Sequence, residues 1–487
     1  MAQNQQSAIK NLDEVQWGAI EQIASDVNSG NISAAENVER ALALVREKQQ
    51  YNAIISTLAD RARLRAQQID EKVARGENAG RLAGVPFIAK DNFLTFGGDT
   101  TAASNILRGF EAPYQSTAIE RLEAEGAICV AKANLDAFAH GSSTENSDFG
   151  TTLNPHDPGK VPGGSSGGSA AAVVLGIVPF ALGTDTGGSI RLPASFCGAV
   201  GYKPTYGLVS RYGVVAMASS TDVIGPLTRT VEDAAVVLDV MAGKDPRDST
   251  TIDRQDCYVP GPRPAATDSR HKVGVVKEFF DEGVQPDVRA AVEAQIDAIK
   301  KAGHEVVEVS IPSIGLALAC YYIIVPAEVS SNLSRYDGQR YGYSASTAQD
   351  LHDSFSQSRG TGFNAENKRR ILIGTYVLSS GYYDAYYKKA AKLRTKLIHE
   401  FNEAFTHVDL LVGPTAPMTA FAIGDNTDDP LQMYLADIMT VAVNLVGVPA
   451  ISVPCPTKGL PVGLQIIAPA RSDASLLAFA QSITEGN

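Results

Sequence analysis

The chain has 487 residues, of which 44% are hydrophobic and 20% charged, a composition typical of soluble globular proteins with a large core. Its net charge of −12 makes the whole surface a poor match for a phosphate backbone, which argues against a protein that binds nucleic acid on its own. The five cysteines are far apart and form no Cys-x-x-Cys pair, so the sequence predicts neither a metal site nor a disulfide framework.

The amino-terminal part of the chain is predicted to be helical. Ser33–Glu36 has the pattern of a capping box, and apolar residues at helical spacing follow it. A second helix is expected from Leu58 to Val73. Residues 1–7 have neither a basic segment nor an apolar segment, so no signal peptide is expected. We therefore expect residues 1–75 to form a helical region that packs on a larger domain, residues 76–487.

From residue 82 onward, predicted strands and helices alternate. The expected strands are Val85–Ala89, Ala127–Ala131, Val178–Leu182, Lys272–Val276, Glu305–Val309, Val408–Val412, Val448–Val453 and Gly463–Ile467. The expected helices are Thr117–Glu125, Gly168–Gly176, Pro286–Ala302 and Ala474–Ile483. Alternation of this kind predicts an α/β fold in which helices cover both faces of one sheet.

Two stretches between these elements have less regular patterns. Residues 244–270 are rich in Asp, Pro and Arg and are expected to cross the surface. Residues 337–367 are rich in Tyr, Ser, Gly and Gln and are expected to form a mobile flap near a site, because long loops are often functional. The most apolar run, Ala170–Leu182, is too short to span a bilayer, so no membrane segment is expected.

Two glycine-rich turns, Gly163–Ser169 and Gly183–Arg191, form the most informative pattern in the chain. Each contains Gly-Gly-Ser, with Ser165 in the first turn and Ser189 in the second. Glycine lets the backbone turn sharply and brings its N–H groups close to a ligand, so each hydroxyl lies beside backbone donors. One hydroxyl can attack a substrate while the other relays a proton. The glycine spacing fits neither a P-loop nor a dinucleotide fingerprint, which argues against a nucleotide site.

A serine nucleophile needs a base, and Lys90 is the candidate. None of the seven histidines lies in a nucleophile-elbow context, and we expect structural roles for His140 and His156. Lys90 follows the apolar strand Val85–Ala89, so its stem should be buried. A free lysine with a pKa of ~10.4 is only about one-thousandth neutral at pH 7.4. Burial that lowers this pKa by about 3 units would make about half of the amine neutral.

Thr186, Gly187 and Gly188 directly precede Ser189. Their backbone N–H groups, together with that of Ser189, can face the oxygen of a tetrahedral intermediate. Such an oxyanion hole contributes about 3 kcal/mol per donor in the transition state. A plain tight turn would use the same glycines, but Asp185 on the other side of the turn favours the oxyanion hole.

Lys90, Ser165 and Ser189 in this arrangement closely resemble the amidase signature family, which hydrolyses amides with a Ser–Ser–Lys triad. The resemblance covers residues 32 to 483, and its most specific part is residues 163–196. It implies a single amidase signature domain with a mixed β-sheet covered by helices on both faces. It also implies that Ser189 is the nucleophile, that Ser165 relays the proton to Lys90, and that the peptide bond of Ser165 is cis.

Within the family, the chain is most similar to the glutamine-hydrolysing subunits of tRNA-dependent amidotransferases. The segments that carry this similarity are Ser331–Gly338, Lys368–Tyr376, Ser380–Ala390 and Asp429–Tyr434. The resemblance implies that Arg370 binds the α-carboxylate of glutamine through its bidentate fork. It further implies that Asp437 binds the α-ammonium and that Tyr321 lines the pocket. Arg369 remains an alternative to Arg370.

The same resemblance implies partner subunits. A B-type subunit would use the ammonia, with ATP and Mg²⁺, to convert Glu-tRNA(Gln) to Gln-tRNA(Gln), and Asp-tRNA(Asn) is a second candidate substrate. The B-type subunit would also provide most of the tRNA contact, and a C-type chain would complete a cytoplasmic heterotrimer. This chain itself would need no cofactor and would bind glutamine.

Two positions depart from the pattern of these subunits. Leu192 stands where they usually have glutamine, and Leu208 stands where they usually have a basic residue. Both are expected near surfaces that couple to a partner. The alternative function is that of a free-standing amidase acting on small or aryl amides. A catalytically silent scaffold is a third possibility, against which the intact set of Lys90, Ser165 and Ser189 argues.

Overall fold

The computed structural model describes residues 17–254, 270–281, 283–426 and 430–484, so Cys257, Asp429 and part of the 244–270 stretch lie outside the described residues. Eleven strands of the described residues form one sheet in the order β1-β3-β2-β4-β6-β5-β10-β11-β9-β7-β8. The strands are β1 Ile54–Thr57, β2 Pro86–Lys90, β3 Ile128–Ala133, β4 Phe180–Asp185, β5 Val200–Lys203, β6 Val223–Thr228, β7 Lys272–Val276, β8 Glu305–Val309, β9 Leu410–Pro414, β10 Ala450–Pro454 and β11 Gly463–Ile467.

The sheet is mixed, as the resemblance implied. Strand β2 pairs in parallel with β3 and β4, and β7 pairs in parallel with β8 and β9. The other neighbouring strands pair antiparallel. The eight strands predicted from the sequence are all present, with ends displaced by at most three residues, whereas β1, β5 and β6 were not predicted. The parallel pairing of β2 with β4 brings two motif-bearing strand ends to the same edge of the sheet.

Helices cover both faces of the sheet because strand side chains alternate between separate apolar clusters. The helices are α2 Ile20–Asn28, α3 Ala34–Glu47, α4 Ala59–Ala74, α5 Thr117–Ala124, α6 Gly167–Val174, α7 Arg191–Cys197, α8 Val231–Met241, α9 Pro286–Lys301, α10 Ala317–Asn332, α11 Leu351–Gly362, α12 Ala365–Leu378, α13 Tyr387–Ala404, α14 Pro430–Leu435, α15 Val441–Val446 and α16 Asp473–Thr484. In β2, Phe87 and Ala89 pack in a cluster with α5, α8 and α16, whereas Ile88 packs with α3, α4 and α6. In β9, Val412 packs with α9 and Leu411 with α10 and α13.

The amino-terminal region contains a strand as well as the predicted helices. The capping box is present, because Ser33 and Glu36 each accept the backbone N–H of the other. Strand β1, which the sequence analysis missed, pairs antiparallel with β3 at one edge of the sheet. Helices α3 and α4 contribute to the apolar cluster that also holds Val130 of β3. This region is therefore continuous with the main sheet, and a domain boundary at residue 75 stays a prediction.

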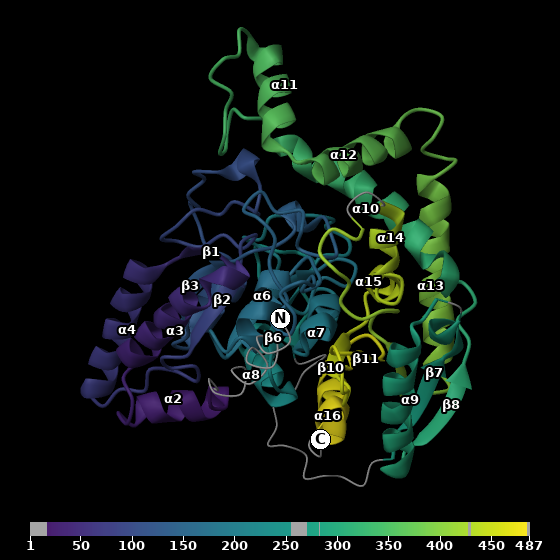
Figure 1. Cartoon of the computed structure of the whole chain (residues 1–487), viewed down its shortest axis with the longest axis horizontal. Coiled ribbons are helices and arrows are strands. Elements are labelled where there is room, and N and C mark those ends of the chain that lie inside the picture. The colour runs from purple at the N-terminus through teal and green to yellow at the C-terminus, as the bar shows by residue number, and fades with distance from the viewer. Residues whose placement is uncertain (1–16, 255–269, 282, 427–429, 485–487) are drawn as a thin grey trace.

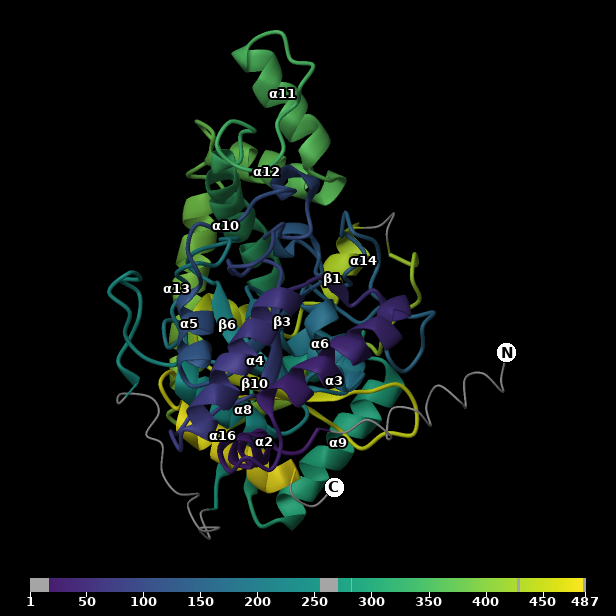
Figure 2. The same ribbon diagram turned by 90° about the vertical axis from the view of Figure 1, so that its left-hand side faces the viewer.

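Helices α11 and α12 stand out beyond the sheet in two perpendicular views (Figures 1 and 2). The prediction of an irregular flap over residues 337–367 was wrong for this part, because Leu351–Gly362 is helical. The Asp350 side chain accepts the Asp353 N–H and so provides the helix with an amino-terminal cap. The Gly, Ser and Tyr content that suggested a loop is therefore overridden by capping and packing.

The side chains at the two departures from the amidotransferase pattern are both buried. Leu192 in α7 is fully buried in a small cluster with Val161 and Phe196. Leu208 is also fully buried and belongs to the cluster that includes α8 and α16. Both leucines fill apolar space in the core, and their proximity to a coupling surface stays a prediction.

One helical stretch among the described residues, Ile314–Arg335, is long and apolar enough to cross a membrane, with a mean hydropathy of 1.5. Half of it is buried inside the protein, which is the usual pattern of a core helix. Its central part is α10, which packs with α13 and α15. This helix carries Tyr321, one of the predicted pocket residues, into the interior.

Candidate active site

Lys90 is the last residue of β2, a fully buried strand between β3 and β4. Its side chain is 0% exposed. The amine nitrogen Nζ lies 2.7 Å from Ser165 Oγ, 2.9 Å from Ser166 Oγ and 2.9 Å from Thr184 Oγ1. Thr184 belongs to β4, and the two serines lie at the amino-terminal end of α6. Three uncharged hydroxyl groups therefore surround the amine.

Burial lowers the pKa of Lys90 to about 7, because removal from water disfavours the charged amine. The carboxylates of Asp136, Asp185 and Asp222 oppose this shift. No ion pair among the described residues involves Lys90 itself. About half of the amine is then neutral near pH 7, so Lys90 can accept a proton at physiological pH.

Ser165 and Ser189 come from two loops that meet beside Lys90. The Gly164–Ser165 peptide bond is cis, as the resemblance implied. The Ser166 N–H donates to the carbonyl oxygen of Ser189 at 3.1 Å and so joins the two loops. Ser165 is completely buried, whereas Ser189 is 7% exposed. Ser165 thus contacts the lysine while Ser189 keeps a small exposed fraction, an arrangement that suits a proton relay and a nucleophile.

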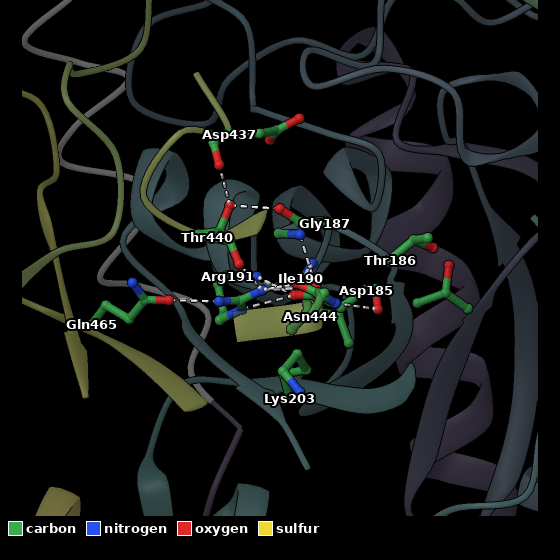
Figure 3. Close-up of polar contacts among 12 residues, drawn as sticks. Asp185, Thr186, Gly187, Ile190, Arg191, Lys203, Asp437, Thr440, Asn444 and Gln465 are labelled. Atoms are coloured by element: carbon green, nitrogen blue, oxygen red, sulfur yellow. Dashed lines mark hydrogen bonds and ion pairs between the residues drawn. The ribbon is translucent and has the colours of Figure 1, made fainter. Parts of the chain in front are cut away.

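A buried ion pair holds the turn that carries Ser189. Arg191 Nε and Nη2 each lie 3.0 Å from one carboxylate oxygen of Asp185 (Figure 3). Arg191 also donates to Gln465 Oε1 and to Asn444 Oδ1, both at 2.5 Å. Burial by itself would raise the pKa of Asp185, but the Arg191 guanidinium and other partners lower it to about 2. The ionised, bidentate pair fixes the geometry of the turn.

Only some of the backbone donors predicted for the oxyanion hole are available. The Gly188 N–H donates to Asp185 Oδ1 at 2.8 Å, so it already has an acceptor. Such capping of a turn by an aspartate side chain is common and was not considered in the sequence analysis. The N–H groups of Thr186, Gly187 and Ser189 have no hydrogen-bond partner within the described part of the chain. These three groups are the candidates that remain.

Tyr321 and Thr440 pack against the two glycines of this turn. A Cβ atom at Gly187 would lie 2.6 Å from the Tyr321 hydroxyl oxygen, so only glycine allows this approach. Gly188 has a φ of 138°, and a Cβ atom there would lie 2.2 Å from Thr440 Oγ1. The close contacts with Tyr321 and Thr440 therefore require glycine at both positions. The contact at Gly187 places Tyr321 beside the predicted oxyanion hole.

The structure distinguishes between the two candidate arginines of α12. The Arg370 side chain is 3% exposed and donates from Nε to Glu366 Oε1 at 2.8 Å, whereas the Arg369 side chain is 41% exposed. The Arg370 guanidinium carbon lies 5.2 Å from the ring centre of Tyr322 and 5.5 Å from that of Tyr434. Arg370 is therefore the interior arginine, held by a carboxylate and two aromatic rings.

Asp437 lies close to the turn that carries Gly187 and Ser189 (Figure 3). Thr440 Oγ1 lies 3.0 Å from the Asp437 carbonyl oxygen and 2.6 Å from that of Gly187. The Asp437 carboxylate accepts the Ser142 hydroxyl at 2.6 Å. Burial raises the pKa of Asp437 to about 7, although Ser142 and Arg370 act against this shift. A ligand ammonium placed beside Asp437 would favour its ionised form.

The histidines near the motif have structural contacts. His140 Nδ1 lies 2.8 Å from Asn367 Nδ2, and burial keeps its pKa well below the usual value. His156 Nε2 lies 2.8 Å from the Cys197 carbonyl oxygen. Neither hydrogen-bonds to Lys90. The described residues contain no group of three or more His, Cys, Asp or Glu side chains arranged to hold a metal ion.

The sequence analysis did not identify four residues that complete this site. Ser166 and Thr184 contact the Lys90 amine, and both lie inside the two glycine-rich turns, so their hydroxyl groups were a usable signal. Glu366 and Tyr434 contact Arg370 or each other. Glu366 precedes Arg370 by one helical turn, a spacing that favours an ion pair.

Comparisons with known proteins identify the family of the chain. A model of the amidase family matches residues 36–477. The chain is 52% identical over 461 residues to the A-type subunit of glutamyl-tRNA(Gln) amidotransferase from Synechococcus sp. (strain RCC307), and the match covers 93% of this chain and 94% of the relative. It is 53% identical over 431 residues to the protein of the same name from Geobacillus thermodenitrificans, and that match covers 88% of each chain.

Solved structures give the same result. The crystal structure of the A-type subunit of glutamyl-tRNA(Gln) amidotransferase from Thermotoga maritima superposes with a TM-score of 0.75 at 39% identity, covering 94% of this chain and 95% of that chain. A second solved structure comes from a study of a vestigial protein complex and the evolutionary origins of an s-triazine catabolic enzyme. It superposes with a TM-score of 0.82 at 32% identity, covering 96% of this chain and 98% of that chain. The predicted resemblance is confirmed, and the chain belongs to the amidase family.

Proposed function

We propose that this chain is the glutaminase subunit of a tRNA-dependent amidotransferase and supplies ammonia for converting Glu-tRNA(Gln) to Gln-tRNA(Gln). The observation that carries the chemistry is the buried amine of Lys90, with a pKa of about 7, at 2.7 Å from Ser165 Oγ. The names of relatives at 52% and 53% identity favour this function over that of a free-standing amidase.

In the acylation step, Ser189 Oγ attacks the side-chain amide carbon of glutamine. The Ser189 proton passes to Ser165 Oγ, and the Ser165 proton passes to the neutral Lys90 amine. The resulting oxyanion accepts hydrogen bonds from the Thr186 and Gly187 N–H groups. When the C–N bond breaks, the proton returns from Lys90 through Ser165 to the leaving nitrogen, which departs as ammonia.

The second half of the reaction releases glutamate. A water molecule attacks the glutamyl ester on Ser189, and Lys90 again takes the proton through Ser165. Collapse of the second tetrahedral intermediate breaks the bond between the acyl carbon and Ser189 Oγ, which regains its proton by the same route. In both half-reactions each transferred proton is held in turn by side chains of this chain.

The pocket for the α-carboxylate and α-ammonium groups of glutamine is formed by residues from α10, α12 and the segment before α15. Arg370 offers its Nη atoms to the α-carboxylate while Glu366 holds its Nε. Asp437 accepts the α-ammonium, which converts its carboxyl group to the charged form. Tyr321 packs on Gly187, beside the predicted oxyanion hole. A plain amide substrate would use none of these charged groups.

Replacement of Arg370 by alanine should change substrate choice. We expect Arg370→Ala to raise KM for glutamine by about 10- to 100-fold, the value of a charge-assisted hydrogen-bond pair of about 1.5–3 kcal/mol. Hydrolysis of propionamide, which lacks an α-carboxylate, should change by less than about threefold. Steady-state assays of ammonia release with both amides measure the difference.

The control for this experiment is Arg369→Ala. Arg369 also pairs with Glu366, but its side chain is 41% exposed, so this variant should leave both activities near those of the wild type. Equal losses on glutamine and propionamide in Arg370→Ala would contradict the role in carboxylate binding and favour the free-standing amidase.

Partner subunits are expected to supply the tRNA contact, ATP and Mg²⁺. The chain carries a net charge of −12, and its basic clusters are short, such as Lys388–Lys389 and Lys368–Arg370. Arg370 is buried, so the second cluster offers even less charge to a phosphate backbone. We propose a cytoplasmic heterotrimer in which a B-type subunit binds tRNA and activates it with ATP, and a C-type chain joins the two.

Purification under mild salt from the native host tests this arrangement. We expect two further chains to co-purify, and we expect glutaminase activity to rise severalfold when Glu-tRNA(Gln) and ATP are added. The chain produced alone should bind tRNA weakly at physiological salt, with a dissociation constant above about 10⁻⁶ M, the range of non-specific binding. A fully active monomer that does not respond to tRNA and ATP would instead identify a free-standing amidase.

A further inference from the structure

A small pocket of about 60 Å³ adjoins the predicted active site. Its polar wall includes side chains of Asn92, Thr184, Thr186, Arg211 and Asp222. Thr184 also contacts the Lys90 amine, and Thr186 belongs to the predicted oxyanion hole, so the pocket adjoins both parts of the chemistry. A buried water molecule needs on the order of 10–15 Å³, so the pocket has room for at least one.

Two residues that line the pocket each carry a buried polar atom with no hydrogen-bond partner in the described part of the chain. These atoms are Asn92 Oδ1 and Arg211 Nε. Asn92 is 2% exposed, and an unpaired buried oxygen of this kind costs about 1–3 kcal/mol. A donor facing Asn92 and an acceptor facing Arg211 can be supplied by one water molecule, which has both.

The hydrogen bonds around Lys90 depend on what Thr184 does with its hydroxyl hydrogen. A neutral amine has two N–H groups and one lone pair. The Ser166 hydroxyl lies 3.2 Å from the Thr184 carbonyl oxygen, which can only accept, so its hydrogen points there. Ser166 Oγ accepts the Thr184 N–H at 3.4 Å and has a second lone pair that can accept one Lys90 N–H. Thr184 Oγ1 already accepts Asn92 Nδ2 at 3.0 Å. If its hydrogen pointed at Lys90, it would occupy the lone pair that Ser165 needs.

We propose that a water molecule in this pocket accepts the Thr184 hydroxyl hydrogen and the Arg211 Nε–H and donates to Asn92 Oδ1. Three hydrogen bonds are usual for a buried water. Thr184 Oγ1 then accepts the second Lys90 N–H, and the lone pair of the amine is directed at Ser165. This inference rests on the proposed function, because it makes Thr184 and Asn92 positioning residues for its base.

The test uses Thr184→Val, which removes the hydroxyl and keeps the shape. We expect kcat for glutamine at pH 8 to fall about 10- to 100-fold with KM within about twofold, because the lone pair loses its fixed direction. The Asp136, Asp185 and Asp222 carboxylates that face Lys90 are unchanged. Loss of the Thr184 acceptor destabilises the charged form of the Lys90 amine and lowers its pKa, so the acid limb of the kcat profile should move to lower pH.

Two further variants separate positioning from general damage. Thr184→Ser keeps the hydroxyl and should restore kcat to within about threefold of the wild type. Thr95 is a fully buried threonine whose hydroxyl has no partner among the described residues, so Thr95→Val should leave kcat and its pH profile unchanged. A Thr184→Val enzyme with wild-type kcat, or with its acid limb moved to higher pH as water entry would cause, would overturn the inference.

Crystallography at high resolution tests the water directly and needs no activity. We expect an ordered water within hydrogen-bond distance of Asn92 Oδ1, Arg211 Nε and Thr184 Oγ1 in the wild type, and its loss in Asn92→Leu. A well-ordered wild-type pocket that contains no such water would overturn the inference. A wild-type chain that does not hydrolyse glutamine would contradict the proposed function, while the water would still be present or absent in the crystal.

Discussion

Replacement of Ser189 by alanine is expected to abolish glutaminase activity while the protein stays folded. The hydroxyl is the only atom group lost, and the nucleophile of a covalent mechanism typically contributes a factor of about 10⁴–10⁶ in kcat. Ser189 is 7% exposed, and its carbonyl oxygen, which joins the two loops, is kept in the variant. The melting temperature should therefore change by only a few degrees. Ammonia release in single and multiple turnovers measures the effect.

A matched control and a labelling experiment make this prediction specific. Ser169 lies on α6, and its hydroxyl donates to the Leu182 carbonyl oxygen at 2.9 Å without touching Lys90. Ser169→Ala removes a comparable hydroxyl and should keep most of the activity. An electrophilic glutamine analogue should label Ser189, as peptide mass spectrometry would show. A label on Ser165, or substantial activity in Ser189→Ala, would contradict the assignment of Ser189 as the nucleophile.

Periodicity predicted eight of the eleven strands in the described residues and missed β1, β5 and β6. The eight predicted strands between Val85 and Ile467 have apolar runs or alternation long enough to identify, and the structure contains all of them. Strands β5 and β6, inside the sheet, were not predicted. Strand β1 is only four residues long, Ile54–Thr57, with two apolar and two polar side chains, so no pattern marks it. Its identity comes from pairing with β3, a long-range contact that local sequence does not encode. The same limit applies to the order of strands in the sheet.

The glycine-rich motif predicted which catalytic residues lie close together, whereas the hydrogen bonds that they make could be seen only in the folded structure. Lys90 and Ser165 are far apart in the chain, yet each lies at the end or start of an element whose placement the α/β pattern implies. The use of the Gly188 N–H by Asp185 depends on the detailed path of one turn. The burial of Arg370 rather than Arg369 depends on how α12 is rotated against α10. Polar and apolar residues are mixed along α12, so their spacing in the sequence does not show which side of the helix faces inward.

Lys90→Arg is expected to fail nearly as completely as Lys90→Met, with kcat at least about 10³-fold below the wild type. Arginine stays protonated at all accessible pH values, so it keeps a positive charge but cannot accept the proton from Ser165. Because a buried arginine could also destabilise the fold, the uncharged Lys90→Met variant and a thermal melt of each protein accompany the assay. An active, folded Lys90→Arg enzyme would mean that Lys90 acts only through its charge.

The wild-type pH profile provides the independent half of this argument. The pKa of Lys90 is lowered to about 7, so the amine is charged and inactive below that value and neutral and active above it. The kcat for glutamine should therefore rise with pH, from about one tenth of its plateau at pH 6 to the plateau above pH 8. Asp437, with a pKa of about 7, titrates in the same range, but bound glutamine keeps it ionised. Its protonation should thus affect kcat/KM and not kcat, and a kcat that stays flat between pH 6 and 8 would exclude Lys90 as the base.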